Sequence, residues 1–466
     1  MPAYSISHWS RIQKILFIGL AVLVIFRCAL FTVIIPRPEL VNYYNDSLEY
    51  RKYGDALYNG TAFQWTVDHP LDLKRTIGYP LLLAGIAKLA GPDPLNLVAV
   101  QLLLSGLVGL LIYFYLIRHV GTVIAAITTL LYLSDPLTLV FSLQMMTENS
   151  FTFAIVIVFI FLLLWLQRKQ QRYLLLTGLV LGIACLIRPI GQALIGLWVL
   201  VVLLSSEGFQ PRSLRSRLVH GIKNVLVFLL PVCLVLVPWI IRNSIVWDCP
   251  TISLISRHNL RDYIAAGVLA DVQNVPIEES VAQLVKMDPG PCPKESMPYY
   301  QILLKHPLAY LKLAGIGTLN AIGFSGDMIT LWLTTLGIKY VPMDLWQPYL
   351  SGGLVEVFRI LAEELGKSRE LTLGLFSLVI YQLILYGLAL AGLFNGRSRS
   401  KESNLELLIA LGIILILMLT PGVLGDARFR VPAQPFLLAF GGFGMARIFI
   451  TAKKQNQDEN PPAENF

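Results

Sequence analysis

Ten apolar segments recur along the chain, and they restrict its fold more than any other feature. They cover about residues 15–35, 95–117, 120–134, 147–166, 173–187, 190–204, 222–241, 371–394, 404–420 and 432–450. A bilayer core of roughly 30 Å takes about 20 residues of helix. Only 14% of the residues are charged, against about a quarter in a soluble domain. We therefore expect an all-α polytopic membrane protein with one domain over residues 1–450 and a disordered tail over 451–466.

Basic residues between the segments predict the orientation of the helices. When the segments are threaded in order, Lys and Arg gather in alternate connections, as they do in cytoplasmic loops. The clusters are at Arg11 and Lys14, Arg118, 168–172, 212–223, 397–401, and Lys453 and Lys454. Both termini are thus expected in the cytoplasm, and the protein in the inner membrane of a bacterium. The same bias accounts for the net charge of +8, so no nucleic-acid partner is expected.

Two long stretches, residues 36–94 and 242–370, then remain on the extracytoplasmic side. In the first, residues 76–90 are too short to span comfortably and are expected to form a helix at the membrane interface. In the second, the apolar stretch 308–338 is broken by glycines and could be interfacial, re-entrant or a short hairpin. Cys249 and Cys292 flank the polar part of the second stretch and could form a disulfide in an extracytoplasmic compartment.

Five arginines lie on this side, against the bias that orients the helices. They are Arg75, Arg188, Arg242, Arg428 and Arg430. A guanidinium at the end of a membrane span can hold a phosphate through paired hydrogen bonds. Snorkelling to lipid headgroups or pairing with a nearby acid would also place arginines there. For the whole set, an anionic substrate is the favoured interpretation.

Acidic candidates lie at the same side of the predicted bundle. Asp46 follows the first apolar segment, where a carboxylate could face water and a membrane-borne substrate together. It could also simply cap a helix that begins at Ser47. Asp68 in the same polar stretch, and Glu148 at the start of the fourth apolar segment, are further candidates for a substrate site.

The chain has no nucleotide-binding, metalloprotease or serine-hydrolase motif. Instead, an ordered set of segments resembles the GT-C superfamily of integral-membrane glycosyltransferases, in the branch of protein O-mannosyltransferases and bacterial aminoarabinose transferases. The segments are NDSLEYRKYGDALYNG, RTIGYPLLLAG, MTENSFTF, TGLVLGIACLIRPIG, VPWIIRNSIVW and GDARFRVPAQPFLLA. The resemblance implies a GT-C-like fold with about 10–12 transmembrane helices and interfacial helices in the first outer loop.

The resemblance also implies an enzyme that moves a sugar from a polyprenyl-phosphate donor in the lipid bilayer to an acceptor, with inversion. Asp46 would orient the acceptor or act as the base that activates it. The arginines would stabilise the departing lipid phosphate, Arg242 and Arg430 ahead of the other three. Tyr79 and Asn243 are additional substrate-site candidates within the matching segments. A divalent cation, Mg²⁺ or Mn²⁺, is left open as a cofactor, and neither the sugar nor the acceptor is identified.

Two other functions stay open from the sequence. A flippase or transporter of lipid-linked sugars would need polar groups along helix faces in the middle of the membrane. Most of the charged candidate residues lie instead at the predicted outer ends of the helices, which favours an enzyme. A non-catalytic membrane assembly subunit that keeps the fold is the second alternative.

Overall fold

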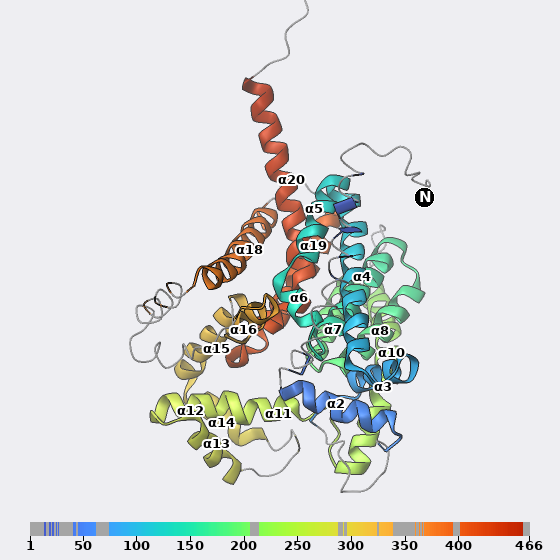
Figure 1. The fold of residues 1–466 in the computed structure, drawn as a ribbon. Coiled ribbons are helices and arrows are strands. Elements are labelled where there is room, and N and C mark those ends of the chain that lie inside the picture. Colours follow the sequence, from blue (N-terminus) through green and yellow to red (C-terminus); the bar gives the residue numbers. More distant parts are fainter. Residues whose placement is uncertain are drawn as a thin grey trace, which may run out of the picture.

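The computed structural model describes residues 41–42, 45–61, 74–205, 214–287, 292, 296–323, 326–338, 368–394 and 401–459, with isolated positions at 14–27 and 359–366. The secondary structure of these residues is helical, without a strand, which confirms the predicted all-α class (Figure 1). The elements are α2 (Asn45–Tyr58), α3 (Gly78–Ala90), α4 (Pro94–Val120), α5 (Thr122–Leu133), α6 (Pro136–Ser142), α7 (Glu148–Arg168), α8 (Gln171–Ile187), α9 (Gly191–Leu204), α10 (Leu214–Trp247), α11 (Ile255–Asn259), η3 (Leu260–Ala265), α12 (Ala266–Gln273), α13 (Ile277–Lys286), α14 (Met297–Lys305), α15 (Pro307–Ile322), α16 (Gly326–Thr335), α18 (Arg369–Leu393), α19 (Lys401–Leu419), η6 (Gly422–Leu424), η7 (Ala427–Ala433) and α20 (Gln434–Glu459).

Several of these helices can cross a membrane. Among the described residues, four are long and apolar enough by themselves, namely α4, α7, α10 from Leu218 and α18. The pair α5 and α6 would make a fifth span with a 52° bend, and α8, α9 and α19 contribute shorter apolar helices. The chain is therefore an integral membrane protein. The predicted interfacial helix over residues 76–90 corresponds to α3, and most of the first apolar segment lies outside the described residues.

The bend between α5 and α6 has a local cause. Pro136 has no N–H, so it cannot continue the hydrogen-bond ladder of α5. Arg27 supplies donors to the carbonyl groups left at the end of α5, with Nε 2.6 Å from the oxygen of Leu133 and Nη2 3.2 Å from that of Tyr132. The buried Arg27 thus has partners inside the bundle and stabilises the break in the span.

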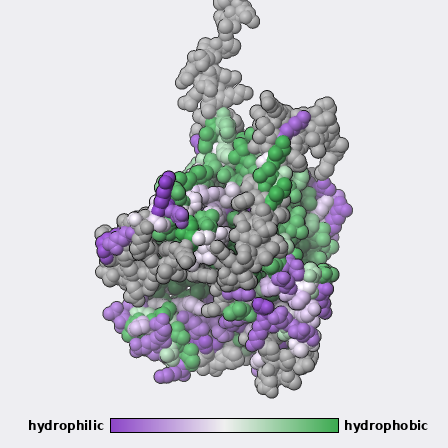
Figure 2. All heavy atoms as spheres, in the orientation of Figure 1, coloured by the Kyte–Doolittle hydropathy of each residue, from purple (hydrophilic) through white to green (hydrophobic). Residues whose placement is uncertain are grey.

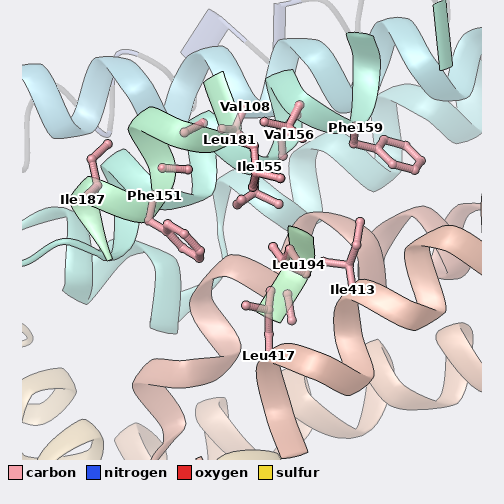
Figure 3. Close-up of a cluster of buried hydrophobic side chains, with 14 of the residues drawn as sticks. Val108, Phe151, Ile155, Val156, Phe159, Leu181, Ile187, Leu194, Ile413 and Leu417 are labelled. Atoms are coloured by element: carbon pink, nitrogen blue, oxygen red, sulfur yellow. The ribbon is translucent and has the colours of Figure 1, made fainter. Parts of the chain in front are cut away.

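The core is a continuous apolar cluster between the long helices. Figure 3 shows part of it, with side chains of α4, α7 and α8 on one side and of α9 and α19 on the other. Close contact between helices depends on small residues: a Cβ added to Gly178 of α8 would lie 2.1 Å from the carbonyl oxygen of Phe228 in α10. Such contacts let backbones pack in a membrane, where apolar side chains gain little by leaving lipid.

One end of the bundle is closed by helices that run across it. In Figure 1, α2 and α12 lie across the direction of α4, α7 and α8. Hydrophilic residues gather at this end in Figure 2, and hydrophobic ones cover much of the rest of that face. We call it the polar end and define it by α2 and α11 to α14. Cys249 and Cys292 form a disulfide there, with their Cα atoms 5.5 Å apart.

The stretch 308–338, which the sequence left open, forms α15 and α16. Lys312 in α15 pairs with Asp271 of α12 at the polar end, 2.6 Å away. The other end of α15 meets the middle of α18, where Gln382 and Tyr386 donate to the carbonyl oxygen of Ile322. This path favours the re-entrant arrangement. At the C-terminus, α20 is helical as far as Glu459, although disorder was predicted from residue 451.

Candidate active site

A cavity of about 730 Å³ lies where the polar end meets the helix bundle. Small-molecule sites occupy roughly 300–1,000 Å³. Its lysine, arginine, aspartate and glutamate lining combines four cationic and three acidic side chains: Lys74, Arg75, Arg188, Arg428, Asp46, Glu148 and Asp262. Three of the five predicted arginines, together with Asp46 and Glu148, are therefore brought together from segments that are distant in sequence.

Asp46 lies between two of these arginines. It occupies the first turn of α2, where the helix dipole favours a negative charge. Its Oδ1 is 2.5 Å from Nη2 of Arg75, and its Oδ2 is 3.1 Å from Nη1 of Arg428. Burial by itself would raise the pKa of Asp46, but the charges and hydrogen bonds of the two arginines outweigh it and hold the pKa below the usual value. Asp46 is thus an ionised, firmly held carboxylate.

Arg75 also links Asp46 to a second carboxylate, Glu49, which the sequence analysis did not single out. Its Nε lies 2.7 Å from Glu49 Oε2, and Lys74 Nζ lies 2.5 Å from Oε1 of the same residue. Burial would raise the pKa of Glu49, but its hydrogen bonds and charge contacts with Lys74 and Arg75 lower it. The spacing of Asp46 and Glu49, three residues apart on a helix, was the available signal, since it places both on one face.

A second ion pair joins the start of α7 to the end of α8. Glu148, the first residue of α7, is buried, and its Oε1 lies 2.7 Å from Nη1 of Arg188. Arg188 ends α8 in an extended conformation, as expected for a residue that precedes a proline. The guanidinium groups of Arg188 and Arg428 both lie over the ring of Phe429, at 5.0 and 5.2 Å from its centre. Phe429 thus holds two cations at the cavity.

Arg428 is set by its own short helix. The side chain of Asp426 caps η7 by accepting from the backbone N–H of Arg428 at 2.8 Å. The preceding turn packs directly on α15, because a Cβ on Gly317 would lie 2.0 Å from the carbonyl oxygen of Gly422. α15 therefore supports the segment that carries Arg428.

The other two arginines do not line this cavity. Arg430 is fully buried, and its Nη1 donates to the carbonyl oxygens of Ala321, Ile322 and Gly323 at the end of α15. These carbonyls lack partners within their own helix, so the guanidinium acts as a cap. Arg242 donates to the side chain of Asn243 at 2.9 Å and lies over the ring of Trp239.

Two of the remaining predicted substrate-site residues, Tyr79 and Asn243, do not line the cavity. Tyr79 is buried, donates to Gln101 at 3.3 Å and packs edge-on against Tyr50. Asn243 donates to the carbonyl oxygen of Thr251 at 2.6 Å. Asp68 lies outside the described residues.

A further wall of the cavity comes from α11, η3, α14 and α15, all within the predicted outer stretch 242–370. It presents a mixture of polar and aromatic side chains: Ser256, His258, Asn259, Tyr263, Tyr300 and Tyr310. Residues Leu260–Ala265 form a π-helix, and such turns recur at functional sites. The wall is assembled from two parts of this stretch, residues 255–265 and 297–322, which the fold brings together.

The acidic residues do not form a cage for a divalent cation. Among the described residues, no group of three or more His, Cys, Asp or Glu side chains is placed to hold a metal ion. Asp46, Glu49 and Glu148 are paired with arginine or lysine instead.

Residues 68–239 match the family model described as dolichyl-phosphate-mannose-protein mannosyltransferase. Over these residues the chain is similar to that family of GT-C glycosyltransferases. The match includes Arg75, Glu148 and Arg188, and it confirms the resemblance inferred from the ordered segments. No curated protein sequence matches this chain.

Solved structures similar to this chain at low identity include two membrane enzymes. The apo oligosaccharyltransferase of Archaeoglobus fulgidus is 12% identical with a TM-score of 0.49, and the match covers 96% of this chain and 52% of that one. This chain thus spans about half the length of the archaeal enzyme. ArnT from Cupriavidus metallidurans, bound to undecaprenyl phosphate, is 15% identical with a TM-score of 0.38, and the match covers 94% of this chain and 79% of that one.

Proposed function

We propose that the chain transfers a sugar from a polyprenyl-phosphate donor to an acceptor at the polar end, which the charge bias predicts to be extracytoplasmic. The observation that carries the proposal is that Arg75, Arg188 and Arg428 line one cavity together with Asp46, beside apolar helices. A lipid-linked sugar needs such a site, with an apolar neighbourhood for its chain and cations for its phosphate. The family match supports the same reaction class.

The arginines bind the phosphate and stabilise it as it departs. Each guanidinium has five N–H donors in a fixed fork, so an arginine that contacts Asp46 or Glu148 keeps further donors for a phosphate oxygen. Preorganised cations at the point where negative charge develops lower the barrier without reorganisation. Because Arg242 and Arg430 have other contacts, the proposal assigns this role to the three cavity arginines.

Asp46 orients the acceptor and holds the arginines in place. Its lowered pKa keeps it ionised, so it can accept a hydrogen bond from an acceptor hydroxyl. The same lowered pKa makes it a weak proton acceptor. Of the two roles predicted for Asp46, orientation therefore fits the geometry better than proton removal.

The test uses the purified chain in lipid vesicles with tritium-labelled polyprenyl-phosphate hexoses, and it measures donor binding and the release of free sugar to water. We expect Asp46→Asn to retain the fold and to release sugar about a hundredfold more slowly, as for a misplaced reactant. Asp55→Asn is the matched control, since Asp55 is exposed on the same helix.

Two outcomes would contradict the proposal. Donor binding without any release of sugar by the wild type would indicate a carrier of lipid-linked sugars. Neither binding nor release across the donors would indicate an assembly subunit.

A further inference from the structure

His258 lines the cavity and has the hydrogen-bond arrangement of a base. It lies on α11, and its Nδ1 is 3.0 Å from the carbonyl oxygen of Leu254. A carbonyl oxygen can only accept, so Nδ1 carries the proton in this bond, and Nε2 of the neutral ring keeps a lone pair. Within the described part of the chain, Nε2 has no hydrogen-bond partner.

The acidic residues of the cavity are less suited to remove a proton. Each of the three carboxylates that line it has an arginine partner: Asp46 has Arg75 and Arg428, Glu148 has Arg188, and Asp262 has Arg261. These ion pairs engage the carboxylate groups that would otherwise face the proton of an acceptor. His258 is the lining residue whose available nitrogen is a neutral acceptor.

The segment before α11 fixes His258 relative to the arginines. Ser253 Oγ donates to the carbonyl oxygen of Lys74 at 2.6 Å and accepts from the N–H of Ile255 at 3.1 Å. Trp239 Nε1 donates to the carbonyl oxygen of Ile252 at 3.0 Å. The segment that leads into α11 is therefore hydrogen-bonded both to α10 and to Lys74, the neighbour of Arg75. These bonds hold the segment that carries His258 next to the segment that carries Arg75.

We propose that His258 is the catalytic base of the transfer, an inference that rests on the proposed function. Nε2 takes the proton of an acceptor hydroxyl while its oxygen attacks the anomeric carbon. The bond from that carbon to the phosphate oxygen breaks, and its electron pair stays on the phosphate held by Arg75, Arg188 and Arg428. The imidazolium then returns its proton to water. When water is the acceptor, the products are free sugar and polyprenyl phosphate.

The experiment measures sugar release from a tritium-labelled polyprenyl-phosphate hexose and donor binding in vesicles. His258→Asn keeps a side-chain N–H that can donate to Leu254 but has no basic nitrogen, so it separates structural support from proton removal. His258→Ala opens space for added imidazole. His220→Asn is the matched control. Nδ1 of His220 likewise lies 2.8 Å from the carbonyl oxygen four residues earlier, that of Ser216, and His220 is not among the residues that line the cavity.

We expect both His258 variants to bind donor within about twofold of the wild type and to release sugar about a hundredfold more slowly. Imidazole should restore part of the rate of His258→Ala and none of that of His258→Asn, and His220→Asn should match the wild type. If the wild type is active and His258→Asn releases sugar at a rate within about threefold of it, His258 is not the base, and the proposed function still stands. A wild type inert toward every donor that it binds would overturn the proposed function and the inference with it.

Discussion

Asp46 and Arg428 are 382 residues apart in sequence, and their side chains lie 3.1 Å apart. Arg75 completes the group from the other side of the carboxylate. The first polar segment of the chain is thus joined to the last connection before α20. Substitutions in either segment should therefore affect the same cavity.

Arg428→Ala should slow sugar release by about two to three powers of ten, because it removes a preorganised cation from the phosphate. Arg428→Lys should retain part of the rate, since lysine keeps the charge and loses the planar fork that lies over Phe429. Initial rates with labelled donor measure both. Arg51→Ala on the exposed face of α2 is the control, and an equal loss in that variant would argue against a specific role.

The stability of the polar end should fall in acid. The pKa values of Asp46 and Glu49 are lowered in the folded protein. A depressed folded pKa contributes stability that is present above the unfolded pKa of about 4 and is lost as the pH falls through the folded pKa. Thermal unfolding of the wild type in detergent, measured from neutral pH down to about pH 2, should show this loss.

The double variant Asp46→Asn, Glu49→Gln should unfold at a lower temperature at neutral pH and should change less on acidification. Asp55→Asn should follow the wild-type profile, since exposed ion pairs such as Asp55 with Arg51 contribute little. Parallel acid profiles for the wild type and the double variant would contradict the prediction.

Gly317→Ala should destabilise the protein by about 1–3 kcal/mol, because the new methyl group would overlap the backbone of the turn before Arg428. Gly315→Ala on the same helix meets no atom within 4 Å and should be neutral or stabilising by about 0.5–1 kcal/mol. Thermal midpoints of the two variants compare them directly. Equal midpoints would show that α15 does not pack on this turn as described.

Removal of the disulfide by Cys249→Ser with Cys292→Ser should loosen the segment that carries His258. A disulfide typically contributes about 2–4 kcal/mol, so the amides of α11 should exchange with deuterium much faster. Hydrogen exchange followed by mass spectrometry measures this. Cys233→Ser, at an exposed position of α10, should leave the exchange unchanged, and unaltered exchange in the double variant would contradict the prediction.

The sequence by itself determined the class of fold and most of its elements. Apolar length predicted the membrane helices, and α3 could be placed because its apolar run is too short to span. Pro189 and the first turns of α2 and α7 likewise placed Arg188, Asp46 and Glu148 at helix ends. These features depend on the period and length of local segments, which the chain shows directly.

Only the tertiary structure decided which charged groups meet. Sequence reasoning put Arg242 and Arg430 ahead of the other three arginines. In the structure Arg75, Arg188 and Arg428 line the cavity, while Arg430 caps α15 and Arg242 lies over Trp239. The role of His258 depends on α11 being attached beside Lys74. Charged groups attract each other strongly in a partly buried site only when they lie within a few ångströms. Contacts between segments distant in sequence set those distances, and no local pattern does.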